Sequence, residues 1–195
     1  MFQIIFALAI WGLVHSFLAS LAVKDFTRRT FGAGFMRLYR LTYNIFSVIS
    51  FTPVLWLVAT LPDHNVYSVS APWNYLMLVG QGLAALGLLV AVLQMDSLHF
   101  VGLRQLFEED KPGELVTSGF YKLVRHPIYT FSLLFLWLTS TMTVNSLTFY
   151  IGATMYFLIG AYFEERKLLR EFGSVYAEYK AVTPMLIPGL LLSKR

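Results

Sequence analysis

The sequence predicts an all-α integral membrane protein with about five transmembrane helices, a helical hairpin and a carboxy-terminal cytoplasmic amphipathic helix. The chain has 195 residues, of which 57% are hydrophobic and only 13% are charged. A soluble domain usually carries about 25% charged residues. The hydrophobic residues gather in runs long enough to cross a bilayer. All 15 Lys and Arg residues lie between or after those runs.

Five apolar runs give the predicted spans. The first three are residues 2–23, 43–61 and 73–95. The last two, 127–143 and 147–163, form a tight helical hairpin. Each hairpin arm is near the lower length limit of about 17 residues for crossing roughly 30 Å of hydrocarbon.

The basic residues predict the orientation of the chain. Segments 24–40, 96–125 and 164–195 hold every Lys and Arg, and the intervening segments 61–72 and 144–146 hold none. With five spans, the three basic segments fall on one face, and such an excess marks the cytoplasmic side. We therefore expect a multi-pass protein with its amino terminus outside and its carboxy terminus in the cytoplasm. The expected partner is the lipid bilayer; nucleic acid is not expected, and no obligate protein partner is evident.

Two amphipathic segments fall on the predicted cytoplasmic face. Hydrophobic residues recur at helical spacing over 97–107, which predicts a helix lying in the membrane interface. The same spacing over 164–182 predicts a helix that continues the last span and ends near Pro184.

The triplet Arg125-His126-Pro127 begins the fourth predicted span. Proline suits the first position of a helix, where its missing N–H would be unpaired anyway. Arg125 and His126 then lie at the positive end of the helix dipole, so an anion should compensate them. Lipid phosphate is one such anion. An anionic ligand group, held by Arg125 and free backbone N–H groups, is the other.

Glu164 and Glu165 end the fifth predicted span at the same membrane face. Water with the neighbouring Arg166 or Lys167 is one way to stabilise the two carboxylates; a ligand ammonium is another. A ligand with a carboxylate, an ammonium and a further positive centre suits Arg125 and the glutamate pair together, and S-adenosyl-L-methionine is such a ligand. There is no cysteine, and the four histidines are scattered, so no metal site is expected.

Several motifs follow one another in the carboxy-terminal half. They are Gly113-Glu-Leu-Val-Thr-Ser-Gly119-Phe-Tyr121, Arg125-His-Pro-Ile-Tyr129, Glu164-Glu165, and Phe172-Gly173-x-x-Tyr176-x-x-Tyr179 before Pro184. This order resembles the isoprenylcysteine carboxyl methyltransferase superfamily of integral membrane methyltransferases. The amino-terminal motifs Trp11-Gly-x-x-His15-Ser and Arg40-x-x-Tyr43 more loosely resemble its methanethiol S-methyltransferase and NnrU-like branch.

The resemblance implies an S-adenosylmethionine-dependent membrane methyltransferase. We expect one membrane domain over 1–195, with three spans in 1–95 and a cofactor-binding catalytic half in 96–195. The resemblance implies that the cofactor lies under the cytoplasmic face. The implied cofactor residues are Leu115, Val116, Gly119, Tyr121, Arg125, His126, Pro127, Tyr129, Glu164 and Glu165. Of these, Arg125, His126 and Glu165 are the expected catalytic residues. The charge of Arg125 favours the thiolate form of a substrate thiol, and His126 or Glu165 accepts the thiol proton.

The sequence departs from the carboxyl methyltransferase pattern at residues 160–163. In the family pattern, an Arg suited to a substrate carboxylate stands just before the paired Glu. This chain has Gly-Ala-Tyr-Phe at these positions instead. This favours a small or lipophilic thiol as the methyl acceptor. A carboxyl methyltransferase of the isoprenylcysteine type, an NADPH-dependent membrane reductase of the sterol reductase type and a non-catalytic membrane factor remain alternatives.

His15 and Arg40 are the expected substrate residues. His15 lies about 22 Å along the first span, toward its cytoplasmic end. A histidine there is either packed and hydrogen-bonded, with Ser16 as a partner, or in contact with substrate, because an ionisable group inside a span is a functional candidate.

Overall fold

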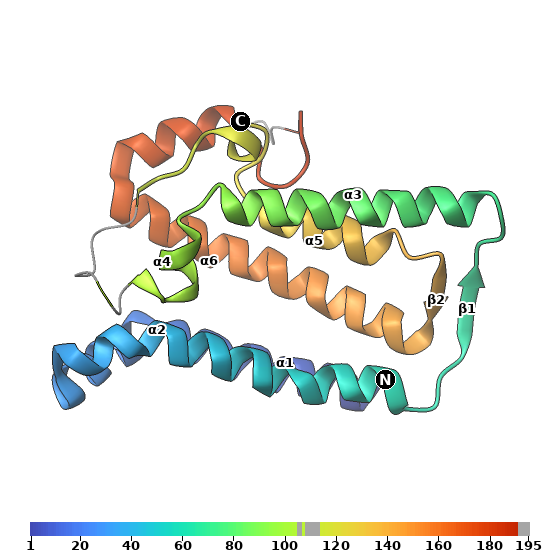
Figure 1. The fold of residues 1–195 in the computed structure, drawn as a ribbon, viewed down its shortest axis with the longest axis horizontal. Coiled ribbons are helices and arrows are strands. Elements are labelled where there is room, and N and C mark those ends of the chain that lie inside the picture. The colour runs from blue at the N-terminus through green and yellow to red at the C-terminus, as the bar shows by residue number, and fades with distance from the viewer. Residues whose placement is uncertain (105–106, 108–113, 191–195) are drawn as a thin grey trace. The chain divides into compact units, whose positions relative to one another are not determined.

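The computed structural model describes residues 1–104, 107 and 114–190, without the side chains of Ala33, His99 and Phe100. Its elements in chain order are α1 (Phe2–Ala19), α2 (Leu21–Thr60), β1 (Asn65–Ser68), α3 (Trp73–Leu93), α4 (Ser97–Val101), the 3-10 helix η2 (Gly119–Lys122), α5 (Pro127–Trp137), β2 (Thr141–Thr143) and α6 (Val144–Val182) (Figure 1). The two strands pair in one small sheet. The predicted all-α fold class is confirmed.

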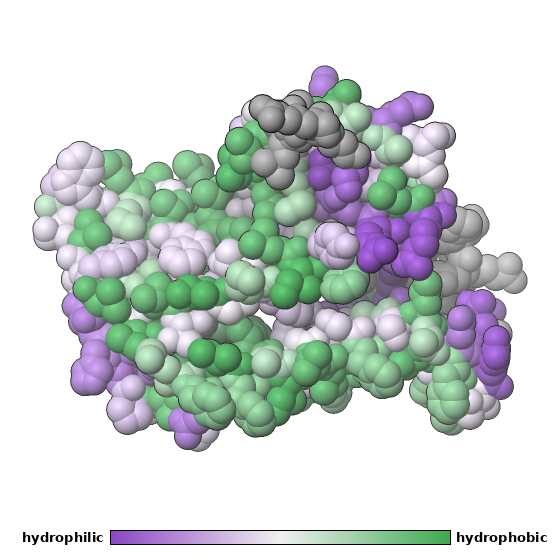
Figure 2. Space-filling model, turned by 180° about the vertical axis from the view of Figure 1, so that it is seen from behind, coloured by the Kyte–Doolittle hydropathy of each residue, from purple (hydrophilic) through white to green (hydrophobic). Residues whose placement is uncertain are grey.

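Among the described residues, four helical stretches are long and apolar enough to cross a membrane. They are α1, the part Gly34–Thr60 of α2, α3 and α6. The face of the molecule in Figure 2 shows hydrophobic side chains over much of its surface. On α1, for example, Phe2 is 77% exposed and Leu13 is 72% exposed. Exposed apolar area on this scale indicates contact with lipid, which supports a multi-pass membrane protein.

The described chain divides into two compact units that alternate along the sequence. The first unit comprises Met1–His64, Asp96–Pro112 and Thr143–Gly152, and the second comprises Asn65–Met95, Gly113–Met142 and Ala153–Arg195. The third predicted span therefore belongs to the unit that carries Arg125 and the glutamate pair. The expectation of a single domain with a boundary after residue 95 stays a prediction.

In the first unit, α1 and α2 pack against each other. Ser20 separates them with an extended backbone, and its side chain caps α2 by accepting a hydrogen bond from the Val23 N–H. The first helix therefore ends before residue 23, and the basic segment 24–40 belongs to α2. Gly32, with φ of 78°, interrupts α2. Glycine adopts this left-handed conformation without the steric cost of a Cβ.

The predicted interfacial helix over 97–107 is shorter than expected, since α4 ends at Val101. Gly102 follows with φ of 95°, and a Cβ there would lie 2.6 Å from the backbone nitrogen of Leu41. The Asn44 side chain also donates to the carbonyl of Val101 at 2.8 Å. The close approach to α2 and a left-handed glycine stop the helix at this point. Most of 105–113 lies outside the described residues.

A carboxylate joins the chain segments at the other end of the first unit. Asp63 Oδ1 accepts hydrogen bonds from the backbone N–H of His64 at 2.8 Å and of Asn145 at 3.0 Å. Desolvation opposes ionisation of this group, but hydrogen bonds from Thr143, Asn145 and His64 outweigh it and lower the pKa of Asp63. The ionised carboxylate therefore holds the chain leaving α2 against the start of α6.

In the second unit, α3 packs along α5 (Figure 1). Gly87 lies under the ring of Phe131, where a Cβ would approach the ring to 2.5 Å. Helix α5 has 11 residues and so spans only about 16 Å. The predicted helical arm over 127–143 is wrong beyond Trp137. The threonines that follow favour extended backbone, and Thr141–Thr143 forms β2.

Helix α6 confirms the predicted run from an apolar span into an amphipathic helix. It has 39 residues and ends at Val182, two residues before Pro184. The sequence does not predict the break at Gly173, where φ is 56° and ψ is −128°. At this break the chain turns, as the red end of α6 shows in Figure 1. The turn brings the last helical residues back toward the start of α5.

Candidate active site

The start of α5 is held by the chain that follows α6. Pro127 occupies the first turn of α5, as predicted, and His126 precedes the helix as its N-cap residue. The backbone N–H of Arg125 donates to the carbonyl of Pro184 at 2.9 Å, and that of His126 donates to Met185 at 3.1 Å. The backbone N–H groups of Arg125 and His126 are therefore satisfied within the protein, and the expectation that Arg125 and free N–H groups at this helix end hold an anionic ligand stays a prediction. The two N–H groups are bonded because the chain after the Gly173 turn runs beside them.

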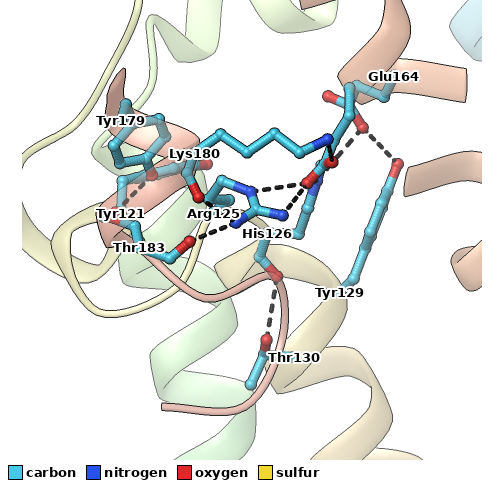
Figure 3. Close-up of polar contacts among 10 residues, drawn as sticks. Tyr121, Arg125, His126, Tyr129, Thr130, Glu164, Tyr179, Lys180 and Thr183 are labelled. Carbon is cyan, nitrogen blue, oxygen red and sulfur yellow. Dashed lines mark hydrogen bonds and ion pairs between the residues drawn. The ribbon is translucent and has the colours of Figure 1, made fainter. Parts of the chain in front are cut away.

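The anion that compensates Arg125 is Glu165 of α6. Figure 3 shows Arg125 among its neighbours His126, Lys180 and Thr183. Arg125 Nε donates to Glu165 Oε1 at 2.7 Å, and the guanidinium Nη2 lies 2.5 Å from the same oxygen. Nη1 donates to the backbone carbonyls of Lys180 and Thr183. The two ionic side chains are 8% and 7% exposed. The guanidinium thus joins α5, α6 and the segment after α6 through one buried ion pair.

Glu165 forms a second ion pair, with Lys180. Lys180 Nζ lies 2.6 Å from Glu165 Oε2, the carboxylate oxygen that Arg125 does not use, and the lysine side chain is 29% exposed. Each oxygen of the buried carboxylate therefore faces its own positive charge. Two close cations favour the ionised carboxylate and offset the cost of burying it.

His126 lies between the two adjacent carboxylates. Its Nε2 is 3.5 Å from Glu165 Oε1, and its Nδ1 is 3.7 Å from Glu164 Oε2. Glu164 is 45% exposed and accepts a hydrogen bond from the Tyr129 hydroxyl at 2.9 Å. The imidazole stacks on the Tyr129 ring, with centroids 5.3 Å apart. We call Arg125, His126, Glu164, Glu165 and Lys180 the polar cluster.

One atom of the polar cluster is poorly satisfied. His126 is 6% exposed, and its Nε2 is buried without a hydrogen-bond partner among the described residues. The Glu165 oxygen at 3.5 Å is at the far limit for such a bond. A buried imidazole nitrogen in this position can accept or donate a proton if a ligand group reaches it.

The helix η2 connects the polar cluster to the end of α3. The Phe120 N–H donates to Gln94 Oε1 at 2.9 Å, and Gly119, with φ of 60°, leaves room for that Gln94 side chain. The carbonyl of Tyr121 accepts a hydrogen bond from the Tyr179 hydroxyl. Burial raises the pKa of the Tyr121 hydroxyl, so it stays neutral.

Leu115 and Val116 precede η2 in a segment without regular secondary structure, and both are half-buried. Gly119 and Tyr121 are fixed by α3 and α6, whereas Leu115 and Val116 lead into that fixed part. Gly113, which begins the motif, lies outside the described residues. The second unit thus holds all the expected cofactor residues, and it brings Arg125, His126, Tyr129 and the two glutamates into direct contact.

His15 and Arg40 belong to the first unit. His15 Nδ1 lies 3.0 Å from Ser47 Oγ, and Nε2 lies 2.6 Å from the Tyr43 hydroxyl. Since Ser47 Oγ also donates to the carbonyl of Tyr43, a consistent arrangement has His15 donating from Nδ1 and accepting at Nε2. His15 therefore has hydrogen-bond partners on α2. Its role toward substrate, like that of Arg40, stays a prediction.

Sequence reasoning did not include several residues of the site. Lys180 and Thr183 contact Glu165 and Arg125 directly. Nothing in the local pattern distinguishes Lys180 from the other cations of the amphipathic helix, because its partner lies on the far side of the Gly173 turn. Tyr176 and Tyr179 carried part of the family resemblance without an assigned role.

The family comparison covers the part of the chain that contains most of the polar cluster. Residues 75–175 match the family model described as phospholipid methyltransferase (PEMT). The matched range includes most of α3, all of η2 and α5, and the glutamate pair of α6. Lys180 lies just beyond it. No solved structure matches the chain.

Similar curated proteins carry one activity in their names. The chain is 34% identical over 164 residues to methanethiol S-methyltransferase 2 of Bradyrhizobium diazoefficiens, a match that covers 80% of this chain and 62% of that protein. It is 31% identical over 193 residues to methanethiol S-methyltransferase of Pseudomonas deceptionensis, covering 94% and 71%. It is 34% identical over 198 residues to methanethiol S-methyltransferase of Crocosphaera subtropica, covering 93% and 72%.

The predicted family resemblance is confirmed by both comparisons. The chain spans 62% of the length of the first of these relatives and a little over 70% of the other two. The family match covers more than half of the chain and includes both motifs that form the buried ion pair. This chain therefore belongs to the phospholipid methyltransferase family of membrane proteins, together with the methanethiol S-methyltransferases that it resembles.

Proposed function

We propose that this protein is a membrane methyltransferase that transfers a methyl group from S-adenosylmethionine to the sulfur of a small or lipophilic thiol. The observation that carries the proposal is the buried Arg125–Glu165 pair at the start of α5, inside the family match. The relatives named above supply the acceptor class, since all three are named for methanethiol.

The side chains of the polar cluster suit the amino-acid end of S-adenosylmethionine. That end carries one carboxylate and one ammonium. Arg125 and Lys180 are cations suited to the first, and Glu164 and Glu165 are carboxylates suited to the second. The buried Nε2 of His126, which has no hydrogen-bond partner among the described residues, indicates that a further polar group belongs beside it.

The residues of the cluster also suit the proton and charge changes of thiol methylation. When bound, S-adenosylmethionine supplies an electrophilic methyl group on a sulfonium. The positive charge of Arg125 favours the thiolate form of a nearby acceptor. His126 can accept the thiol proton at Nε2, and Glu165 at 3.5 Å stabilises the resulting imidazolium. The Tyr129 ring, stacked between His126 and Phe157, fixes the imidazole plane.

The surroundings of the glutamate pair favour a thiol over a carboxylate. Gly160 lies one helical turn before Glu164, and a Cβ there would be 3.8 Å from the Tyr129 hydroxyl. An arginine that could bind a substrate carboxylate is absent from 160–163, so such a carboxylate would compete with the donor for Arg125. A thiolate needs only one favourable cation.

We further propose that the polar cluster faces the cytoplasm. If the helices cross as predicted, the basic segments all fall on one face of the membrane. Membrane proteins carry an excess of Lys and Arg on their cytoplasmic side, so this face would be the cytoplasmic one. His15 and Arg40 are proposed to contact the acceptor substrate.

A methyl-transfer assay with two acceptors tests the acceptor class. Protein purified in detergent is given methyl-labelled S-adenosylmethionine and either an alkyl thiol or a farnesylcysteine analogue with a free carboxylate. We expect a labelled thioether from the thiol, formed faster as pH approaches the thiol pKa of about 8.5. The methyl ester of the farnesylcysteine analogue is the matched control, because it lacks the free carboxylate. A base-labile ester formed from the acid alone would overturn the thiol proposal and favour a carboxyl methyltransferase.

A further inference from the structure

The buried polar atoms that have no hydrogen-bond partner among the described residues include His126 Nε2 and the hydroxyl of Tyr176. The Tyr176 side chain is almost completely buried, at 1% exposure. Most buried polar groups in native proteins are hydrogen-bonded, and an unpaired hydroxyl destabilises the fold. An atom kept in this state needs a reason, and an absent ligand group is one.

Tyr176 lies in the part of α6 that follows the Gly173 break. It stands one helical turn before Lys180, whose Nζ pairs with Glu165. The Tyr176 ring is 5.9 Å from that of Tyr179. The two tyrosines differ in one respect, since the Tyr179 hydroxyl donates to the Tyr121 carbonyl whereas that of Tyr176 is unpaired. Tyr179 therefore stabilises the fold, and the hydroxyl of Tyr176 contributes no such bond.

We infer that the Tyr176 hydroxyl is a ligand-binding group that hydrogen-bonds the zwitterionic amino-acid end of the methyl donor. The inference rests on the proposed function and adds to it a residue of the donor site. A hydroxyl suits either charge of that group, because it donates to a carboxylate and accepts from an ammonium.

The two ion pairs of Glu165 allow a zwitterion to bind without a change in net charge. Lys180 is one turn after Tyr176, so the two side chains share a face of the helix. Lys180 is the more exposed of the two cations on Glu165. A ligand ammonium can replace it on Glu165 Oε2 while the ligand carboxylate pairs with the displaced lysine.

Two matched substitutions test this assignment. Tyr176→Phe and Tyr179→Phe each remove one hydroxyl from neighbouring rings on the same helix. We measure the S-adenosylmethionine affinity by equilibrium dialysis and the ligand-free melting temperature in the same detergent. For Tyr176→Phe we expect about 10- to 100-fold weaker binding, as for loss of a hydrogen bond to a charged group. Its ligand-free melting temperature should be unchanged or higher. For Tyr179→Phe we expect a lower ligand-free melting temperature.

Each outcome supports the assignment or overturns it. Wild-type affinity in Tyr176→Phe would overturn it, and a lower ligand-free melting temperature with unchanged affinity would give Tyr176 a purely structural role. Failure of the proposed function looks different, because the unaltered protein would then not bind S-adenosylmethionine at all. If the unaltered protein binds S-adenosylmethionine and Tyr176→Phe binds it with the same affinity, only the Tyr176 assignment is overturned.

Discussion

Replacing Glu165 by glutamine should destabilise the protein far more than the same replacement at Glu164. Glutamine has nearly the shape of glutamate, so the change removes a charge and little else. At position 165 it leaves two cations, Arg125 and Lys180, around a neutral amide. At position 164 it alters a carboxylate that is 45% exposed and accepts one hydrogen bond from Tyr129.

The size of the difference follows from burial. Arg125 and Glu165 are both less than one-tenth exposed, and removing one partner of such a pair costs about 3–5 kcal/mol because a buried charge is left unpaired. A half-exposed group in a single hydrogen bond contributes about 1 kcal/mol or less. For a chain of this size, we expect the melting temperature to fall by roughly 6–20 °C in Glu165→Gln. In Glu164→Gln the fall should be a few degrees at most.

Thermal unfolding of the two purified variants in one detergent, followed by circular dichroism, measures the difference. Each variant is compared with the unaltered protein at neutral pH and without ligand. Equal melting temperatures for Glu165→Gln and Glu164→Gln would refute the idea that a buried ion pair joins α5 to α6.

Three further predictions concern other parts of the chain. Gly87→Ala should lower the melting temperature, because the new methyl group would overlap the Phe131 ring. Gly82→Ala is the control on the same helix. It should be neutral or stabilising by up to about 1 kcal/mol, because the space around Gly82 is open. Asp63→Ala should destabilise the first unit above about pH 5, where the Asp63 carboxylate is ionised and its hydrogen bonds contribute in full to the free energy of unfolding. Chemical unfolding at several pH values should show the stability difference from the unaltered protein shrinking as pH falls through the lowered pKa of Asp63. A stability difference that stays constant with pH would contradict this prediction. A reporter that works only in the cytoplasm should be active at the carboxy terminus and inactive at the amino terminus, and the reverse pattern would overturn the predicted orientation.

Helix starts were predictable from the sequence where local chemistry decides them. The helices that begin at Phe2, Trp73 and Pro127 start where expected, because an apolar run or a proline marks each start. The end of α6 before Pro184 was also predictable from local chemistry, because the residue that precedes a proline disfavours the helical conformation.

Helix breaks and ends that depend on neighbouring elements were not predictable. Helix α5 stops at Trp137 because the threonines beyond it pair with β1, which is more than 70 residues earlier in the chain. Helix α4 stops where Gly102 approaches α2. No helix was predicted over the basic segment 24–40, because its charges interrupt the hydrophobic run, yet it is helical on both sides of Gly32.

The candidate site was predictable as a set of residue types but not as a set of pairs. The need for an anion near Arg125 and for a cation near the glutamate pair both followed from helix ends and burial. The structure shows that these needs partly satisfy each other, since Glu165 is the anion. Lys180 could not be identified because only the turn at Gly173 brings it back to Glu165.

Direct comparison of S-adenosylmethionine and NADPH binding tests the central claim most simply. Unaltered protein in detergent is titrated with each compound in a calorimeter, and its melting temperature is followed in parallel, because a ligand that binds only the folded state raises it. We expect S-adenosylmethionine to bind and to raise the melting temperature, and NADPH at the same concentration to do neither. Binding of NADPH without binding of S-adenosylmethionine would contradict the methyltransferase proposal and favour a membrane reductase.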